Sequence, residues 1–228
     1  MVIAAIGMLV SSCGTGNNTN AKLSSDVDSA LYAWGVANGA GLREGLKTLP
    51  GAEDKETFDA LIAGFATALN GKTSELKMTP DEAQEYFQTY ITEAQTKQME
   101  SIKAEGEAFL ASNRSGAGVI TTESGLQYKV ITEGTGKKPT TENVVTVHYT
   151  GTLLDGTVFD SSVERGEPAE FPVTGVIRGW TEVLQLMPVG SKYQVWIPSE
   201  LAYDNAGPQH QLYNRLLTFE VELLGIKE

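Results

Sequence analysis

Residues 147–162, VHYTGTLLDGTVFDSS, contain two apolar runs that are separated by the dipeptide Asp155-Gly156. In the first run apolar and polar residues alternate, as where the polar His148 stands between the apolar Val147 and Tyr149. A period of two places neighbouring side chains on opposite faces of a β-strand, and Asp-Gly is a strong signal for a tight hairpin turn. The stretch therefore predicts antiparallel strands with one face buried and the other exposed to water.

The same alternation recurs on both sides of this stretch. Further strands with apolar residues two positions apart are predicted at 126–130, 193–197 and 217–223. Residues 180–187 show helical spacing instead, and a proline follows them. One short amphipathic helix packed on a curved antiparallel sheet is an α+β arrangement, which we predict for residues 116–228.

The first half of the chain predicts helices. Apolar residues recur three or four positions apart within 24–49 and 53–69. The sequence Thr79-Pro80-Asp81-Glu82 combines an N-cap, a proline in the first turn and a capping-box glutamate. A third, long helix should begin there and continue to about residue 113. After Gln95 it loses its apolar face, which predicts that the helix leaves one folded body and crosses solvent.

Composition excludes several classes of function. The 228 residues carry a formal net charge of −12, and both halves of the chain are acidic, so nucleic acid is not an expected partner. Hydrophobic residues make up 41% of the chain, enough for a substantial core. One cysteine allows no internal disulfide, and two histidines are too few for a common zinc site without cysteines. We therefore predict no metal and no cofactor.

The beginning of the chain predicts export and anchoring. Residues 2–10 are apolar, but a bilayer span takes about 20 residues. Residues 1–12 are therefore interpreted as a signal peptide, and the residues around Cys13 resemble a bacterial lipobox in which that cysteine is lipidated. The small polar residues within 13–22 are typical of a tether. No Lys or Arg precedes Lys22, and the alternative is a buried strand or helix with an ordinary free cysteine.

Four motifs stand in order in the second half: VHYTG at 147–151, GTVFDSS at 156–162, VIRGW at 176–180 and FEVELL at 219–224. With these motifs, residues 118–228 resemble an FKBP-type peptidyl-prolyl cis-trans isomerase domain. The helical first half resembles, by architecture more than by motif, the dimerisation domain of the Mip/FkpA subgroup of that family, which includes bacterial lipoproteins. The resemblance implies an isomerase that accelerates rotation about X–Pro bonds while exported proteins fold.

The resemblance also implies roles for individual residues. Catalytic positions fall on Tyr149, Phe159, Asp160, Ile177 and Tyr203, and substrate-binding positions on Arg165, Phe171, Val176, Trp180 and Phe219. The Trp180 indole is expected to form the floor of the pocket. The Ile177 N–H and the Tyr203 hydroxyl are expected to donate to carbonyl groups beside the substrate proline.

Asp160 is expected to accept a hydrogen bond from the Tyr149 hydroxyl and to pair with Arg165. The alternative is that the pocket aromatics are ordinary core residues and that Asp160 and Arg165 form an exposed ion pair of little energetic value. His148 alternates to the other face from Tyr149, so we interpret it as structural or solvated.

Two positions depart from the pattern of the family. Ala169 stands where an aromatic residue is usual, so that one wall should be thinner or supplied by Phe171. The segment 203–214 lacks the usual glycine after its tyrosine, and Gln211-Leu212-Tyr213 replaces Ile-Pro-Pro. Because this segment helps to cover substrate, the departure bears on affinity, on sequence preference and on binding of tacrolimus-like macrolides, the candidate inhibitors.

Together these inferences divide the chain into five parts. They are a signal peptide at 1–12, a lipidated tether at 13–22, a helical dimerisation domain at 23–78, a connecting helix at 79–115 and an isomerase domain at 116–228. The predicted partners are proline-containing polypeptides, a second copy bound through the N-terminal helices, and a bacterial membrane reached by the lipid anchor, in the cell envelope and facing the periplasm. The alternatives are a small monomeric helical bundle, and a chaperone or proline-peptide binder whose isomerase turnover is incidental.

Overall fold

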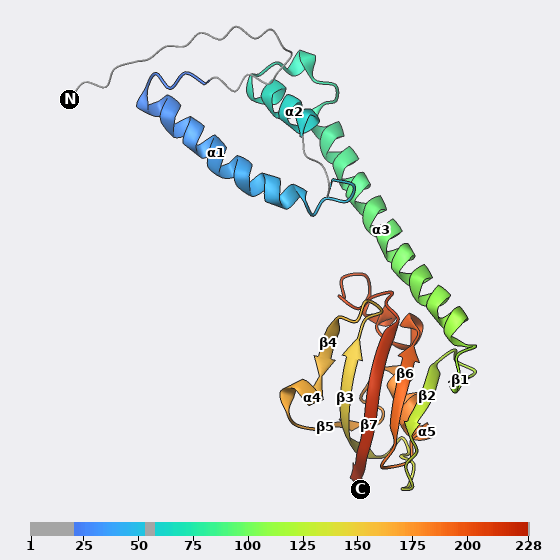
Figure 1. The fold of residues 1–228 in the computed structure, drawn as a ribbon. Coiled ribbons are helices and arrows are strands. Elements are labelled where there is room, and N and C mark those ends of the chain that lie inside the picture. The colour runs from blue at the N-terminus through green and yellow to red at the C-terminus, as the bar shows by residue number, and fades with distance from the viewer. Residues whose placement is uncertain (1–20, 53–57, 228) are drawn as a thin grey trace, which may run out of the picture. The chain divides into compact units, whose positions relative to one another are not determined.

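The computed structural model describes residues 21–52 and 58–227 (Figure 1). The predicted signal peptide, Cys13 and most of the tether lie outside the described residues, as does the beginning of the predicted second helix. Contacts divide the described chain into two compact units, one ending at Ala83 and one beginning at Gln84. Within the described ranges, no helix has both the length and the hydropathy of a membrane-spanning segment.

The first unit is helical, as predicted. It contains α1 (Asp26–Leu46), α2 (Asp59–Leu69) and the short 3-10 helix η1 (Thr73–Glu75). The Ser25 side chain caps α1 by accepting a hydrogen bond from the Asp28 N–H. The helix is shorter at both ends than the predicted 24–49. Neither α1 nor α2 has a buried side chain in the described part of the chain.

The long helix α3 (Pro80–Asn113) begins at the predicted capping box. The Thr79 N–H donates to the Glu82 carboxylate at 2.8 Å, and the Glu82 N–H donates to the Thr79 hydroxyl at 3.3 Å. These two bonds satisfy amide groups that the first turn of a helix leaves without intrahelical partners. The predicted start of this helix is confirmed, and its end at Asn113 agrees with the end expected near that residue, two residues before the limit of 115 given for the connecting helix.

The prediction that α3 crosses solvent after Gln95 is wrong for its last turns, which pack within the second unit. Gly106 is buried, and a Cβ added there would lie 3.0 Å from Leu216 Cβ. The Gln127 side-chain amide donates to the Leu110 carbonyl at 2.8 Å. Hydropathy did not indicate this packing, because much of it is made by a glycine and by polar and backbone groups, to which the Phe109 ring adds a contact with Trp196 at a centroid distance of 6.4 Å.

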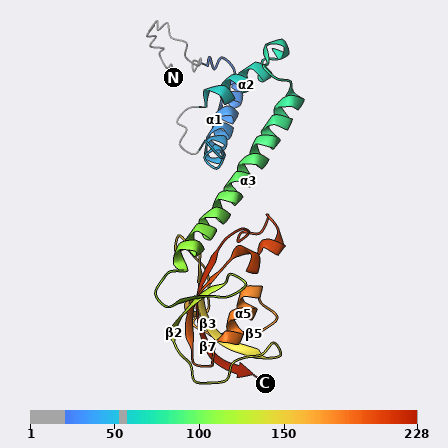
Figure 2. The same cartoon turned by 90° about the vertical axis from the view of Figure 1, so that its right-hand side faces the viewer.

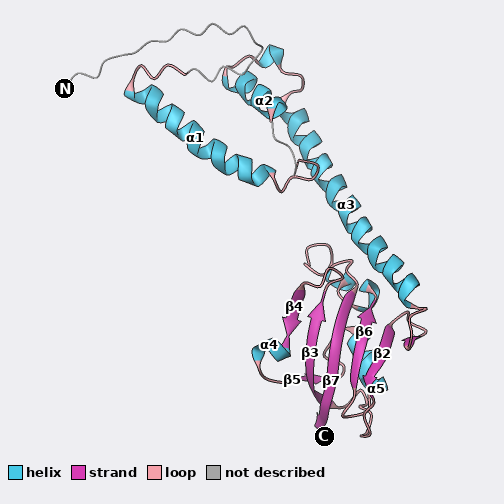
Figure 3. Ribbon diagram, in the orientation of Figure 1, coloured by secondary structure: helices cyan, strands magenta, loops and turns pink. Residues whose placement is uncertain are grey.

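The second unit is a seven-stranded antiparallel sheet with short helices, which confirms the predicted α+β class (Figure 3). Its strands are β1 (Val119–Thr121), β2 (Gln127–Thr132), β3 (Val144–Thr152), β4 (Val158–Ser161), β5 (Ala169–Pro172), β6 (Lys192–Ile197) and β7 (Leu217–Lys227). Its helices are α4 (Ser162–Arg165), α5 (Arg178–Leu186) and the 3-10 helices η2 (Ser199–Leu201) and η3 (Asp204–Ala206). The strand order is β1-β2-β6-β7-β3-β4, and β5 also pairs with β3.

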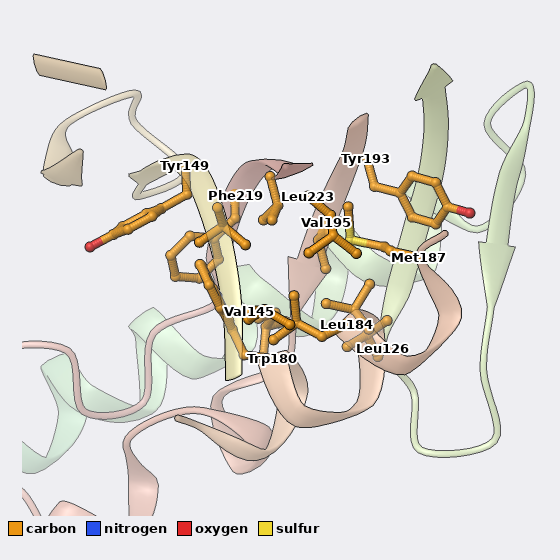
Figure 4. Packing of buried hydrophobic residues seen from close by; sticks show 14 of the residues in the cluster. Leu126, Val145, Tyr149, Trp180, Leu184, Met187, Tyr193, Val195, Phe219 and Leu223 are labelled. Atoms are coloured by element: carbon orange, nitrogen blue, oxygen red, sulfur yellow. The ribbon is translucent and has the colours of Figure 1, made fainter. Parts of the chain in front are cut away.

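The predicted alternation is visible in the burial of the central strands. Every second residue of β3, β6 and the first part of β7 is buried. Helix α5 packs across the inner face of the sheet and adds Trp180, Val183 and Leu184 to the same core (Figure 2). In the close-up, Trp180 lies with Phe219 and Tyr149 at one end of this core (Figure 4). The rings of the predicted site are thus an extension of the core to its edge.

The hairpin turn also forms where the sequence predicts it. The Leu153 N–H donates to the Thr157 carbonyl at 2.9 Å, and the Gly156 N–H donates to the Leu153 carbonyl at 3.0 Å. Gly156 has a φ of 85°, a left-handed conformation that favours glycine. The turn brings β4, with Phe159 and Asp160, beside β3.

Candidate active site

A cleft of about 440 Å³ opens at the edge of the core, between the inner face of the sheet and the start of α5. It is lined by Tyr149, Phe159, Asp160, Phe171, Gly175, Val176, Ile177, Trp180, Tyr203 and Phe219. All the predicted catalytic and substrate-binding residues except Arg165 are in this set. Gly175 was not predicted, because a glycine in a loop carries no side-chain signal.

The Trp180 indole is the centre of an aromatic cage. Its ring lies edge-to-face with Tyr149, Phe171 and Phe219, at centroid distances of 5.1, 5.8 and 5.3 Å. Perpendicular rings are a favourable arrangement because the positive edge of one ring meets the negative face of another. Only 4% of Trp180 is exposed, and that surface belongs to the cleft. The cage holds the indole rigidly, as expected of a floor.

The packing around Gly151 explains why the motif VHYTG at 147–151 ends in glycine. A Cβ at this position would lie 2.6 Å from Phe159 and 2.7 Å from Phe219, which is closer than carbon atoms can approach. The missing side chain lets these two rings pack edge-to-face at 5.5 Å over the strand. Phe159 and Phe219 thereby form one continuous wall of the cleft.

The ion pair of Asp160 and Arg165 borders the other wall of the cleft, on the side of Tyr149. The Tyr149 hydroxyl donates to the Asp160 carboxylate, and Arg165 forms an ion pair with the same carboxylate. Arg165 also donates to the Tyr149 oxygen at 3.0 Å. Both interactions expected of Asp160 are therefore present. Arg165 does not line the cleft, and it acts on the wall through Asp160 and Tyr149.

The ionisation of these groups is set by burial and by pairing. Burial opposes the charge of Asp160, but the bonds from Tyr149 and Arg165 outweigh it and lower the pKa of the carboxyl below its ordinary value. Burial raises the pKa of Tyr149, and the neighbouring Asp160 raises it further. Near neutral pH the wall therefore holds a carboxylate and a protonated phenol.

A buried serine, which sequence reasoning missed, links β3 to the beginning of α4, directly after β4. Ser162 is fully buried, and its hydroxyl accepts a hydrogen bond from the Tyr149 N–H at 2.8 Å. The same hydroxyl lies 3.1 Å from His148 Nδ1. His148 does not line the cleft, and its ring contacts Ser162 instead. The pair of serines after Asp160 in the GTVFDSS motif was the available signal, although it did not distinguish this role.

Among the hydrogen-bond donors at the cleft, two that the family resemblance assigns to substrate have no partner within the described residues. They are the backbone N–H of Ile177, which precedes α5, and the hydroxyl of Tyr203. Burial raises the pKa of Tyr203, and the charge of Asp160 adds to this effect. The phenol therefore stays protonated near neutral pH and can donate. Both groups are donors that the family resemblance implies for substrate carbonyl oxygens.

The two departures from the family pattern have different consequences. Ala169 pairs with Val147 in the sheet and does not line the cleft, whereas Phe171 does, so Phe171 supplies the wall. In the segment 203–214, the His210 ring stacks on Tyr203 at a centroid distance of 4.4 Å and an interplanar angle of 13°. This contact was not predicted, because the segment has no periodic pattern that would place His210.

Comparisons with known proteins agree with this geometry. Residues 135–224 match the model of the FKBP-type peptidyl-prolyl cis-trans isomerase family, and residues 27–130 match that of the domain amino-terminal to such isomerases. An FKBP-type peptidyl-prolyl cis-trans isomerase FkpA from Aeromonas hydrophila is 45% identical over 86% of this chain and 75% of its own length. The outer membrane protein MIP from Legionella longbeachae is 37% identical over 100% of this chain and 97% of its own length.

The fold gives the same result. The crystal structure of FkpA from Escherichia coli superimposes with a TM-score of 0.73 and 33% identity, covering 90% of this chain and 99% of that one. Since sequence and fold agree over most of the chain, it belongs to the FKBP-type peptidyl-prolyl cis-trans isomerase family and is an isomerase of X–Pro bonds.

Proposed function

We propose that the aromatic cleft binds the pyrrolidine ring of a client proline against Trp180 and lowers the barrier to rotation of the preceding amide bond. The barrier of about 18–20 kcal/mol comes from C–N resonance, which makes unassisted rotation take tens of seconds or longer. At the twisted midpoint the resonance is lost and the amide is less dipolar. Withdrawal from water therefore costs the planar amide more than the twisted one.

The observation that carries the proposal is the pairing of this apolar cleft with the two free donors. The Ile177 N–H is suited to hold a carbonyl beside the proline, and the Tyr203 hydroxyl to donate to the carbonyl of the rotating bond or its neighbour. Donors that are fixed before the substrate arrives stabilise one geometry without reorganisation. Asp160, held by Arg165, keeps the Tyr149 wall in place. The reaction breaks no covalent bond, so these groups need only bind and orient.

Tyr203→Phe tests the proposed donor. Loss of one hydrogen bond should lower kcat/KM about fivefold in a protease-coupled assay with a proline tetrapeptide. Tyr213→Phe is the matched control, since Tyr213 lies in the same loop and does not line the cleft, and it should leave the rate unchanged. If wild-type turnover were near background while client aggregation was still suppressed, the alternative of a proline-peptide binder would replace this proposal.

We also propose that the helical unit forms a homodimer. Val27, Leu31 and Trp34 lie one helical turn apart on α1, and each is more than 60% exposed in the single chain. Contiguous apolar surface of this kind indicates an interaction site, and the second copy that the family resemblance implies would cover it.

Leu31→Asp should convert the dimer to a monomer in sedimentation velocity at micromolar concentration, because dimerisation would bury the new charge. Ile131→Asp, at an exposed apolar position of β2, is the control and should remain dimeric. A wild-type chain that sediments as a monomer across this range contradicts the proposal.

Finally, we propose that Cys13 is lipidated after removal of residues 1–12 and that residues 13–22 tether the protein to a membrane of the cell envelope, facing the periplasm. The lipobox-like sequence supports this, and so does similarity to a relative named as an outer membrane protein. Mass spectrometry of the mature N-terminus measures it directly: an acylated cysteine is expected as the first residue.

A further inference from the structure

The segment 203–214, which carries Tyr203, is closed at its base by one carboxylate. Asp204 directly follows Tyr203, and its Oδ1 accepts a hydrogen bond from the backbone N–H of Asn214, at the far end of the segment, at 3.0 Å. Its Oδ2 accepts from the hydroxyl of Ser199 at 2.9 Å. Ser199 is buried in η2, so the carboxylate holds both ends of the segment against a fixed point of the domain.

The far end of the segment is also attached to the long helix. The side-chain amide of Asn214 donates to the carbonyl of Met99 in α3 at 3.2 Å. Asn214 has a φ of 59°, a left-handed conformation that asparagine adopts more readily than most residues. Two residues later, Leu216 packs against the buried Gly106 of α3. The base of the Tyr203 segment is therefore built partly on this helix.

We propose that Asp204 and Asn214 are positioning residues for the isomerase, which act by fixing Tyr203 relative to the cleft and connect that position to α3. The inference rests on the proposed role of Tyr203. The resemblance does not supply this carboxylate, because Asp204 stands where the family usually has glycine. The Tyr203 hydroxyl makes no hydrogen bond within the described residues. The position of the Tyr203 ring therefore depends on the stack with His210 and on the backbone that Asp204 holds.

Removal of the carboxylate tests the first link. Asp204→Ala should lower kcat/KM about fivefold for a proline tetrapeptide, because both ends of the segment lose their common acceptor. Asp204→Asn should keep the rate within about twofold of wild type, since its carbonyl can still accept from Asn214 and its amide can donate to Ser199. Equal losses in both variants, or no loss in Asp204→Ala, would overturn the proposal.

A double-mutant cycle with Tyr203→Phe shows whether Asp204 acts through Tyr203. In the Tyr203→Phe background Asp204→Ala should lower the rate by less than about twofold, because the group that it positions is gone. Full additivity would overturn the proposal and leave the role of Tyr203 intact. A Tyr203→Phe chain as fast as wild type would instead refute the role proposed for Tyr203, so the two failures are distinguishable.

Asn214→Gly tests the link to α3, because glycine retains the left-handed backbone and removes only the bond to Met99. It should lower kcat/KM about twofold to threefold with the full-length chain. The matched control is Asn113→Ala, which removes the 2.9 Å hydrogen bond between the end of α3 and the Gln127 side chain of β2, away from the segment, and should leave the rate unchanged. An equal loss in both variants would assign the effect to helix docking in general and overturn this link.

Discussion

Phe159→Ala is expected to lower kcat/KM about 10- to 100-fold in the protease-coupled peptide assay. The ring forms half of the wall that it shares with Phe219, and it lines the cleft where the rotating amide would lie. Phe159 is partly buried and would be covered by bound substrate, so removal of its ring should cost about 1.5–3 kcal/mol of apolar contact. Each 1.4 kcal/mol lost from the transition state is a factor of about ten in rate. Water would also enter beside the amide and reduce the difference between its planar and twisted forms.

Two further variants separate this effect from general destabilisation. Val158→Ala changes the neighbouring residue of β4, which is exposed and does not line the cleft, and should leave kcat/KM unchanged. Phe159→Leu keeps an apolar side chain without the ring and should give an intermediate rate. A Phe159→Ala enzyme that is folded, as shown by circular dichroism, and within twofold of the wild-type rate would contradict desolvation as the source of catalysis.

The cleft could be predicted from the sequence because its residues lie on regular elements or in recognisable motifs. Alternation in β3 and β7 places Tyr149 and Phe219 on the inner face of the sheet, and helical spacing turns Trp180 toward the same core. The family motifs then indicated which of these core positions line a pocket. Strand alternation and helical spacing predicted which side chains are buried, and the family resemblance was needed to predict function.

The features that sequence reasoning missed lie where the sequence shows no helical or strand periodicity in its apolar residues. The stack of His210 on Tyr203 and the bonds of Asp204 depend on the path of an irregular segment, which no spacing rule describes. The packing of the last turns of α3 was missed for a related reason. Much of its contact involves Gly106 and the Leu110 carbonyl, which contribute to no apolar stripe, and Phe109, which meets Trp196, stands in an otherwise polar stretch.

Gly179→Ala is expected to destabilise the protein by about 2–3 kcal/mol, measured by denaturant unfolding of the full chain. Gly179 precedes Trp180 in α5, and an added Cβ would lie 2.4 Å from Cγ2 of the fully buried Ile197. Alanine in a helix is intrinsically better than glycine by about 1 kcal/mol, but overpacking a close-packed core typically costs about 1–3 kcal/mol and occasionally more. At so short a distance the steric cost should exceed the gain in propensity.

The helix would also have to shift to accommodate the methyl group, and with it the Ile177 N–H and the Trp180 floor, so kcat/KM should fall together with stability. Gly225→Ala is the control, since the space around that residue of β7 is open, and it should change neither quantity appreciably. In an Ile197→Ala background the added methyl group would occupy part of the cavity, and Gly179→Ala should become close to neutral. If Gly179→Ala were as stable as wild type in the original background, close packing of α5 on β6 would not be what fixes the floor of the cleft.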